Sequence, residues 1–262
     1  MIIIGEKLNS SIKSSLDAMT RALNGDDTAA VELICRQEES GAALLDVNTA
    51  LTGDEPGAME LIVRLIQKHS NCGVMPDSPN IDILYRAARI CGRSCLVNSF
   101  PADADLSPLI ELMRETGCSA VLLPTESGRI PEPRVRVELA KSALSSLNAA
   151  GIESGRVYVD ILSESLAVKP DAAINALETL RLLKSETDAR TICGLSNISF
   201  GLPRRMLINS AFLASAIVCR LDAAILDPCR RELADTLHAA NVVAGNDADC
   251  VEYINFVRDE YL

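Results

Sequence analysis

Carboxylates and carboxamides recur in this chain directly after short apolar runs. In CGLSNISFGLP, residues 193–203, the apolar run gives way to Ser196 and Asn197, and Gly201 and Pro203 then end any regular structure. A carboxylate can accept two N–H donors side by side, and a carboxamide can both donate and accept. These groups, with no Lys, Arg or His among them, favour a neutral heterocycle rich in N–H donors, such as an aminopyrimidinone ring, over a phosphate.

Similar polar residues stand at the ends of most of the apolar runs: Glu6 and Asn9, Asp46 and Asn48, Asp77 and Ser78, Asn98 and Ser99, Asp160, Ser196 and Asn197, and Asp227. Any one of them could instead be a helix N-cap or a turn residue, since Asp, Asn and Ser are favoured at both. Several such groups converging on one surface are harder to explain in that way. We therefore expect a ligand site.

The apolar runs predict eight strands, centred near Ile3, Leu45, Val74, Leu96, Leu122, Val159, Gly194 and Ile225. Helical patterns lie between them, for example DDTAAVELICRQEESG, where Asp27 is a candidate N-cap and Gly41 a C-terminal stop. Strands that alternate with helices indicate βαβ units and a parallel sheet. No G-x-G-x-x-G sequence follows the first strand, which disfavours a doubly wound open sheet.

The length of 262 residues suits a single (β/α)8 TIM barrel, which typically takes ~250 residues. We expect one domain over residues 1–262. In such barrels the active site lies at the carboxyl ends of the strands, which is where the polar residues above would meet.

Composition excludes several other classes of function. The net charge is −11 and no Lys/Arg cluster resembles a footprint for a phosphate backbone, so nucleic-acid binding is not expected. No apolar run reaches the ~18–20 residues of a membrane span, and the N-terminus lacks a signal-peptide pattern, so we expect a cytoplasmic protein. The nine cysteines include no C-x2-C pair, and even the close pair Cys91 and Cys95 predicts reduced thiols rather than a metal site.

Several motifs together resemble a known family. MIIIGEKLN, LLDVN, MPDSPN, LVNS, YVDIL and GLSNISFGLPRRMLINSAFL are similar, in order and spacing, to the pterin-binding methyltransferases, above all the methyltetrahydrofolate:corrinoid-protein methyltransferases. The folate module of cobalamin-dependent methionine synthase and the dihydropteroate synthases are more distant relatives. The resemblance covers essentially the whole chain, and it implies a (β/α)8 barrel and a homodimer.

The resemblance also implies roles for individual residues. Asn197 would lie beside the reacting N5 nitrogen of tetrahydrofolate or methyltetrahydrofolate and act in catalysis. The substrate-binding positions would be Asp77, Asn98 and Asp160 on the pterin, Ser196 and Gly194 on the wall beside Asn197, Asp46 and Asn48 on the cavity floor, and Arg205 in the following loop. Arg204 precedes Arg205, and either one could match the arginine of the family.

The implied reaction moves a methyl group between N5 of tetrahydrofolate and the cobalt of a corrinoid (cobalamin). The chain has no D-x-H-x-x-G cobalamin motif, and His238 lies on a predicted helix without that spacing, so the corrinoid would belong to a partner protein. Two alternatives remain open. One is a dihydropteroate synthase-like enzyme, which would need basic residues on a late strand. The other is a non-catalytic pterin-binding subunit.

Overall fold

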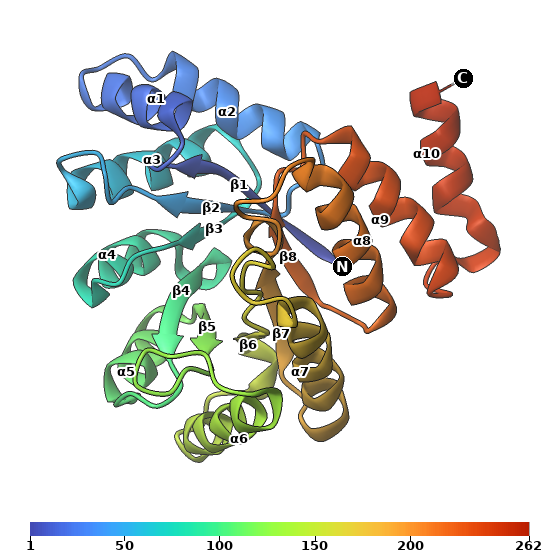
Figure 1. The fold of residues 1–262 in the computed structure, drawn as a ribbon. Coiled ribbons are helices and arrows are strands. Elements are labelled where there is room, and N and C mark those ends of the chain that lie inside the picture. Colours follow the sequence, from blue (N-terminus) through green and yellow to red (C-terminus); the bar gives the residue numbers. More distant parts are fainter. Residues whose placement is uncertain (262) are drawn as a thin grey trace.

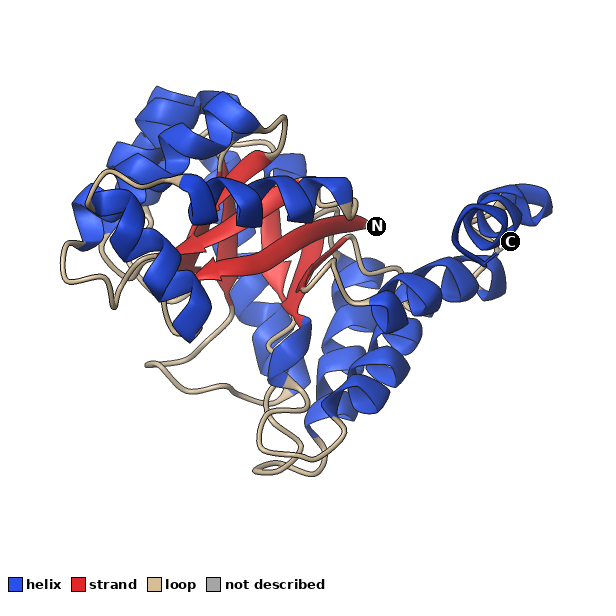
Figure 2. Cartoon of the chain, turned by 90° about the horizontal axis from the view of Figure 1, so that it is seen from above, coloured by secondary structure: helices blue, strands red, loops and turns tan. Residues whose placement is uncertain are grey.

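The computed structural model describes residues 1–261. Eight strands lie in the centre and helices surround them (Figures 1 and 2). The strands are β1 Ile2–Asn9, β2 Leu44–Asn48, β3 Gly73–Pro76, β4 Leu96–Pro101, β5 Ser119–Leu123, β6 Val157–Asp160, β7 Arg190–Gly194 and β8 Ala223–Leu226. All eight coincide with the apolar runs of the sequence, so the predicted (β/α)8 barrel is confirmed.

The helices are α1 Lys13–Leu23, α2 Thr28–Glu39, α3 Glu55–His69, α4 Ile81–Cys91, α5 Ser107–Thr116, α6 Pro133–Ala149, α7 Ala172–Glu186, α8 Arg205–Val218, α9 Arg231–Val243 and α10 Val251–Tyr261. Two of them, α1 and α2, follow β1, and α10 lies beyond α9 on the outside of the ring (Figure 1). None of the helices in the described part of the chain is long and apolar enough to span a membrane.

The sheet is parallel throughout, with strand order β3-β2-β1-β8-β7-β6-β5-β4. Two isolated parallel bridges, Val74 with Cys95 and Asp77 with Asn98, connect β3 to β4. They close the sheet into a barrel, which leaves no long free edge. One of these bridges lies at the carboxyl ends of the strands, so barrel closure itself brings Asp77 beside Asn98.

Two β-bulges interrupt the regular pairing at the same end of the barrel. The first lies in β1, between Gly5 and Leu8, and the second lies in β4, between Val97 and Phe100. A bulge inserts one extra residue into a strand and changes where the neighbouring side chains point. In β1 the backbone N–H of Lys7 donates to Oε1 of Gln37, a fully buried side chain of α2, at 2.9 Å.

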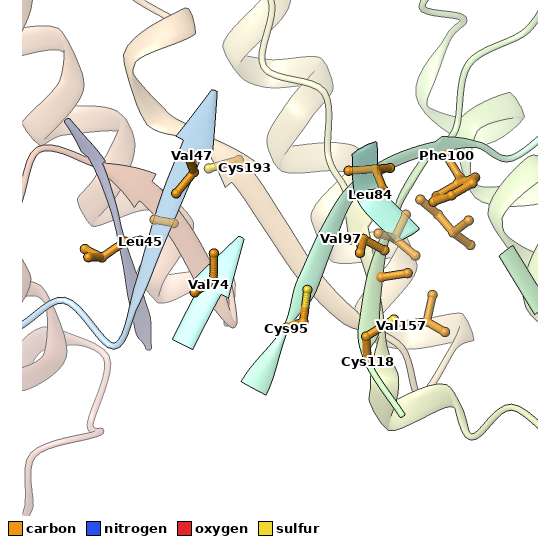
Figure 3. Close-up of a cluster of buried hydrophobic side chains, with 14 of the residues drawn as sticks. Leu45, Val47, Val74, Leu84, Cys95, Val97, Phe100, Cys118, Val157 and Cys193 are labelled. Carbon is orange, nitrogen blue, oxygen red and sulfur yellow. The ribbon is translucent and has the colours of Figure 1, made fainter. Parts of the chain in front are cut away.

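The barrel has two apolar cores, because alternate strand residues face opposite sides. Outward-facing residues such as Leu45, Val74 and Val97 pack against the helices (Figure 3). The interior is filled by a smaller cluster: Ile4, Met75, Leu96, Val121, Tyr158, Ile192 and Ala223. With only four Phe, four Tyr and no Trp, both cores depend chiefly on aliphatic side chains.

For α2, the predicted N-cap is wrong and the predicted C-terminal stop is confirmed. Asp27 precedes α2 but its side chain makes no capping hydrogen bond; Oδ1 of Asp26 instead accepts from the backbone N–H of Thr28 at 3.3 Å. Gly41 lies just past the end of the same helix with φ of 90°, a left-handed conformation that glycine adopts without a steric cost.

Candidate functional site at the carboxyl end of the barrel

The polar residues of the mouth lie directly above the interior core, because side chains two positions apart on a strand share a face. Each lies two residues beyond an interior residue: Glu6 above Ile4, Asp46 above Leu44, Asp77 above Met75, Asn98 above Leu96 and Asp160 above Tyr158. On β7 the corresponding residue is Gly194. The apolar layer thus forms the floor of a polar chamber.

This chamber is a cavity of about 900 Å³. Eight of the nine sequence-predicted site residues line it, namely Asp46, Asp77, Asn98, Asp160, Gly194, Ser196, Asn197 and Arg205. Asn48 does not line it: its Nδ2 donates to Oδ2 of Asp77 at 2.9 Å, and its Oδ1 accepts from Oγ of Ser10 at 3.2 Å. Asn48 therefore holds a lining carboxylate in place.

Asp46 is a buried carboxylate, and its neighbour Asp77 is half-buried. Burial and the charge of Asp77 raise the pKa of Asp46 well above its usual range, and burial raises the pKa of Asp77 as well. Asp46 is only 4% exposed, and its Oδ1 has no hydrogen-bond partner among the described residues. A buried acceptor without a donor is costly, so this oxygen is available to an N–H group of a ligand.

Asp160 ends β6 on the same side of the cavity. Its Oδ1 accepts from the backbone N–H of Leu162 at 2.8 Å, which fixes the carboxylate plane. Burial raises the pKa of Asp160 to about 6, against smaller opposing effects of this hydrogen bond and of Arg136. We call Asp46, Asp77, Asn98 and Asp160 the acidic side of the mouth.

None of the four residues of the acidic side caps a helix. The capping side chains found near this end of the barrel are Asp54 on α3, which accepts from Gly57 at 3.1 Å, and Asn80 on α4, which accepts from Asp82 at 3.0 Å. Only Asp160 has a turn hydrogen bond of its own. Helix capping therefore does not explain why the acidic side is polar.

Asn197 lies on a single 3₁₀ turn, Leu195–Asn197, that follows β7. Its side chain is close to Gly194, where a Cβ would lie 2.8 Å from Nδ2 of Asn197. Two contacts hold the turn: Oγ of Ser196 donates to Oε1 of Glu6 at 2.9 Å, and Nη2 of Arg205 donates to the carbonyl oxygen of Ser196 at 2.6 Å. Arg205, rather than Arg204, therefore contacts the turn that carries Asn197.

The mouth carries more positive charge than the predicted Arg205 alone. Four basic residues line the cavity, and we call them the cationic rim: Lys7, Arg204, Arg205 and Arg230. Nζ of Lys7 lies 3.0 Å from Oδ2 of Asp227, and Nε of Arg230 lies 3.3 Å from the same oxygen.

The sequence alone does not place Lys7 in the mouth, because strict alternation along β1 would put its side chain on the opposite face from Glu6. The bulge in β1 breaks that alternation, and both side chains line the cavity. The MIIIGEKLN run carries no signal for a bulge except Gly5. A Cβ on Gly5 would lie 2.4 Å from Oε1 of Gln37, so the glycine permits the close approach of the side chain that holds the bulge.

Barrel and mouth together define a class, a (β/α)8 protein whose ligand chamber is lined by buried and half-buried carboxylates and amides. Comparison with known proteins makes the class specific. A family model described as pterin binding enzyme matches residues 6–227, and the chain belongs to this family of pterin-binding enzymes.

Among curated proteins, the chain is 28% identical over 266 residues to a methylcorrinoid:tetrahydrofolate methyltransferase of Eubacterium limosum, a match that covers 98% of this chain and 96% of that protein. It is 27% identical over 244 residues to a methionine synthase of Mycobacterium tuberculosis, covering 86% of this chain but only 20% of the relative. A dihydropteroate synthase of Coxiella burnetii in complex with pteroic acid has the same fold, with a TM-score of 0.71 at 15% identity over 94% of each chain.

Proposed function

We propose that this chain transfers a methyl group between N5 of tetrahydrofolate and the cobalt of a corrinoid carried by a separate protein. The observation that supports this most directly is the acidic side of the mouth. A pterin presents an amino group and ring N–H groups along one edge, and carboxylates already removed from water gain most from such donors. The similarity to the methylcorrinoid:tetrahydrofolate methyltransferase of E. limosum, over nearly the whole of both chains, supports the same reaction.

In this proposal the acidic side binds and orients the pterin. Asp77, Asn98 and Asp160 accept from and donate to its polar edge, and the unpartnered Oδ1 of Asp46 receives a further N–H group. Asn48 keeps the Asp77 carboxylate in place through its 2.9 Å hydrogen bond. Gly194 and Ser196 form the adjoining wall, where a glycine lets the flat ring approach the backbone.

Asn197 is the proposed catalytic residue. The electron pair of the broken bond stays on N5, and an unprotonated nitrogen is a poor leaving group, so N5 must take up a proton as the methyl group leaves. The Asn197 amide can hydrogen-bond N5 while that proton arrives from solvent. Losing one such oriented partner typically costs on the order of 2.7–4 kcal/mol in the barrier. The cobalt, in its lowest oxidation state, supplies the nucleophile when the partner docks.

The decisive experiment measures methyl transfer from methyltetrahydrofolate to free cobalamin reduced to cobalt(I), followed by the absorbance of the corrinoid. We expect transfer by the wild-type protein and a much slower rate in Asn197→Ala. Tight folate binding without transfer would instead support a non-catalytic pterin-binding subunit. If the protein did not bind folate, both the methyltransferase and the pterin-binding subunit would be contradicted.

A dihydropteroate synthase-like condensation is the second candidate, and the cationic rim favours it. That reaction displaces pyrophosphate, for which Lys7 and the three arginines of the rim could provide positive charge. The residues at the end of β7 argue against it, since Ser196 and Asn197 stand there and the arginines follow only in the loop. Assaying dihydropteroate formation from a pterin pyrophosphate and p-aminobenzoate separates the two reactions.

Two further expectations belong to this proposal. We propose that residues 1–262 act as one pterin-binding domain and that the chain forms a homodimer. Sedimentation equilibrium of the purified protein tests the second statement, and a monomer at micromolar concentration would contradict it.

A further inference from the structure

Arg136 is a buried cation that the chemistry proposed above does not use. It lies in the first turn of α6, is 0% exposed, and is among the largest fully buried side chains of residues 1–261. A buried charge is costly unless it is paired and hydrogen-bonded, and the N-terminus is the unfavourable end of a helix for a cation. A cation kept at this position must therefore be stabilised by specific contacts.

The contacts of Arg136 are mainly with backbone carbonyl groups. Its Nε donates to the carbonyl oxygen of Pro131 at 2.7 Å, and its Nη1 donates to those of Ile161 and Leu162 at 3.0 and 3.2 Å. The carboxylate of Glu164 is more distant, at 3.4 Å from Nη2. Arg136 therefore ties the loop before α6 to the loop that follows β6.

The loop after β6 has a backbone conformation that needs such support. Leu162 has φ of 56°, a left-handed conformation that costs free energy for a residue other than glycine. The carbonyl groups that Arg136 holds are those of Leu162 and of the residue before it. In this conformation the backbone N–H of Leu162 donates to Oδ1 of Asp160 at 2.8 Å. Arg136 thus fixes, through Leu162, the carboxylate that ends β6.

The same loop also supports the wall that carries Asn197. Oγ of Ser163 donates to the carbonyl oxygen of Gly194 at 2.8 Å, and the backbone N–H of Leu166 donates to that of Ile198 at 3.0 Å. Gly194 and Ile198 flank the 3₁₀ turn that ends in Asn197. A single loop therefore connects the end of β6 with the turn of the proposed catalytic residue, and a buried arginine anchors the first residues of that loop.

We infer that Arg136 is a positioning residue for the pterin site, because it holds the loop after β6 in the conformation that aims Asp160 and the Asn197 turn at the ligand. This inference rests on the proposed function. Arg136 acts through the loop, since its side chain is fully buried and does not line the cavity. Its positive charge also lowers the pKa of Asp160, against the larger opposite effect of burial.

Other titratable groups interact with this pair, and the test leaves them unchanged. They are the thiol of Cys193 near Asp160 and, around Arg136, the carboxylates of Glu132, Glu164 and Asp171. Burial raises the pKa of the Cys193 thiol, so this group keeps its proton over the range in which Asp160 titrates.

The test measures methyltetrahydrofolate binding by calorimetry in Arg136→Met, a substitution that removes the charge and keeps an unbranched side chain. We expect the affinity at about pH 7 to fall by about tenfold, as for the loss of a supporting hydrogen bond. The pH below which affinity declines should also move upward from about 6, because Asp160 loses a nearby positive charge that favours its ionised form. A residue that only stabilised the fold would not move this pH.

Arg156→Met is the matched control. Arg156 also donates to backbone carbonyl groups, those of Met113 and Cys118, but it precedes β6 at the amino end of the strand. This variant should keep the affinity and its pH dependence.

Two further variants separate positioning from charge. On the Asp160→Asn background, Arg136→Met should weaken binding much less than in the wild type, since the group through which it acts is already altered. Arg136→Lys keeps the charge but not the planar fork of donors, so it should retain the wild-type pH dependence and still bind about threefold more weakly.

Wild-type affinity and pH dependence in Arg136→Met would overturn the inference and leave the proposed function intact. Equal effects of this substitution with and without Asp160→Asn would overturn it as well, because they would indicate a purely structural role. Arg136→Lys carries the same comparison if Arg136→Met does not fold, and wild-type affinity in it, or loss of folding in both variants, also counts against the inference. A wild type that bound no methyltetrahydrofolate would contradict the proposed function itself.

Discussion

The acidic side and the cationic rim of the mouth differ in how the protein holds their charges. The carboxylates and the amide of the acidic side stand on or immediately after strands and lie above the apolar interior. Asp46 is buried, and the other three are half-buried. Most residues of the cationic rim stand on loops or helix starts and are exposed; Lys7, in the β1 bulge, is the exception. Burial therefore perturbs the pKa values of Asp46, Asp77 and Asp160.

This difference separates two ways of recognising one ligand. A buried carboxylate makes a strong and directional hydrogen bond, but its ionised form is destabilised until a donor arrives. Exposed arginines cost little to maintain and contribute modest, salt-sensitive attraction. We expect the acidic side to determine whether a pterin binds, and the rim to add a weaker attraction that salt reduces.

The largest effect is expected on the acidic side. Asp160→Asn keeps an acceptor for the N–H of Leu162 but removes the charge, and it should weaken methyltetrahydrofolate binding by about a hundredfold, as for the loss of a strong charge-assisted interaction. Asp77→Ala and Asp160→Ala should weaken binding in the same way without unfolding the protein. Calorimetric titration and thermal melting measure the two properties separately. A shift in melting temperature with unchanged affinity would show that these carboxylates are structural.

Asp160→Asn should also stabilise the protein at about pH 8. The pKa of Asp160 is raised to about 6 in the folded state, above the ordinary value of about 3.9, so the folded state binds its proton more tightly. The stability that this group contributes is present at low pH and is lost as pH rises through about 6. Removing the charge should recover about 1–3 kcal/mol, measurable by denaturant unfolding. An unstabilised variant would mean that Asp160 remains well hydrated.

The next effect concerns the turn between the two sides. Asn197→Ala should lower the single-turnover rate of methyl transfer to cobalt(I) cobalamin by at least about tenfold, with a weaker effect on folate affinity, because the hydrogen bond to N5 strengthens toward the transition state. Rapid-mixing kinetics beside equilibrium binding provide both values. An unchanged rate would leave Asn197 as a turn residue with no part in the chemistry.

A smaller effect should appear in the pH dependence of binding. Below pH about 6, Asp160 is increasingly protonated and no longer offers a carboxylate to the pterin, so affinity should fall by up to about tenfold per pH unit. An affinity that stays the same between about pH 5 and about pH 7 would mean that the Asp160 carboxylate does not contact the pterin.

The smallest effect is expected far from either side. Cys91 ends α4 and Cys95 precedes β4, and both are buried. Replacing both with serine should leave transfer activity and metal content unchanged, because two thiols alone do not complete a metal site. Metal analysis of the purified protein is the check, and stoichiometric zinc or iron that disappears in the double variant would contradict this prediction.

Local sequence pattern is enough to predict the barrel and most of the acidic side. Eight apolar runs, each followed by an amphipathic stretch, leave few topologies other than a closed parallel sheet. Once the strands are known, their period of two places Asp46, Asp77, Asn98 and Asp160 above the interior core. These positions follow from local pattern, and they could be predicted without knowing which strands are neighbours.

The cationic rim and its separation from the acidic side depend instead on contacts between distant parts of the chain. Lys7 reaches the mouth through a bulge held by Gln37 of α2, and its partner Asp227 comes from the far end of the chain. Arg204 and Arg230 lie in loops, whose path over the mouth no periodicity specifies. The burial that perturbs the carboxylates likewise arises only when all eight strands close around them, since desolvation depends on every neighbour in space and not on neighbours along the chain.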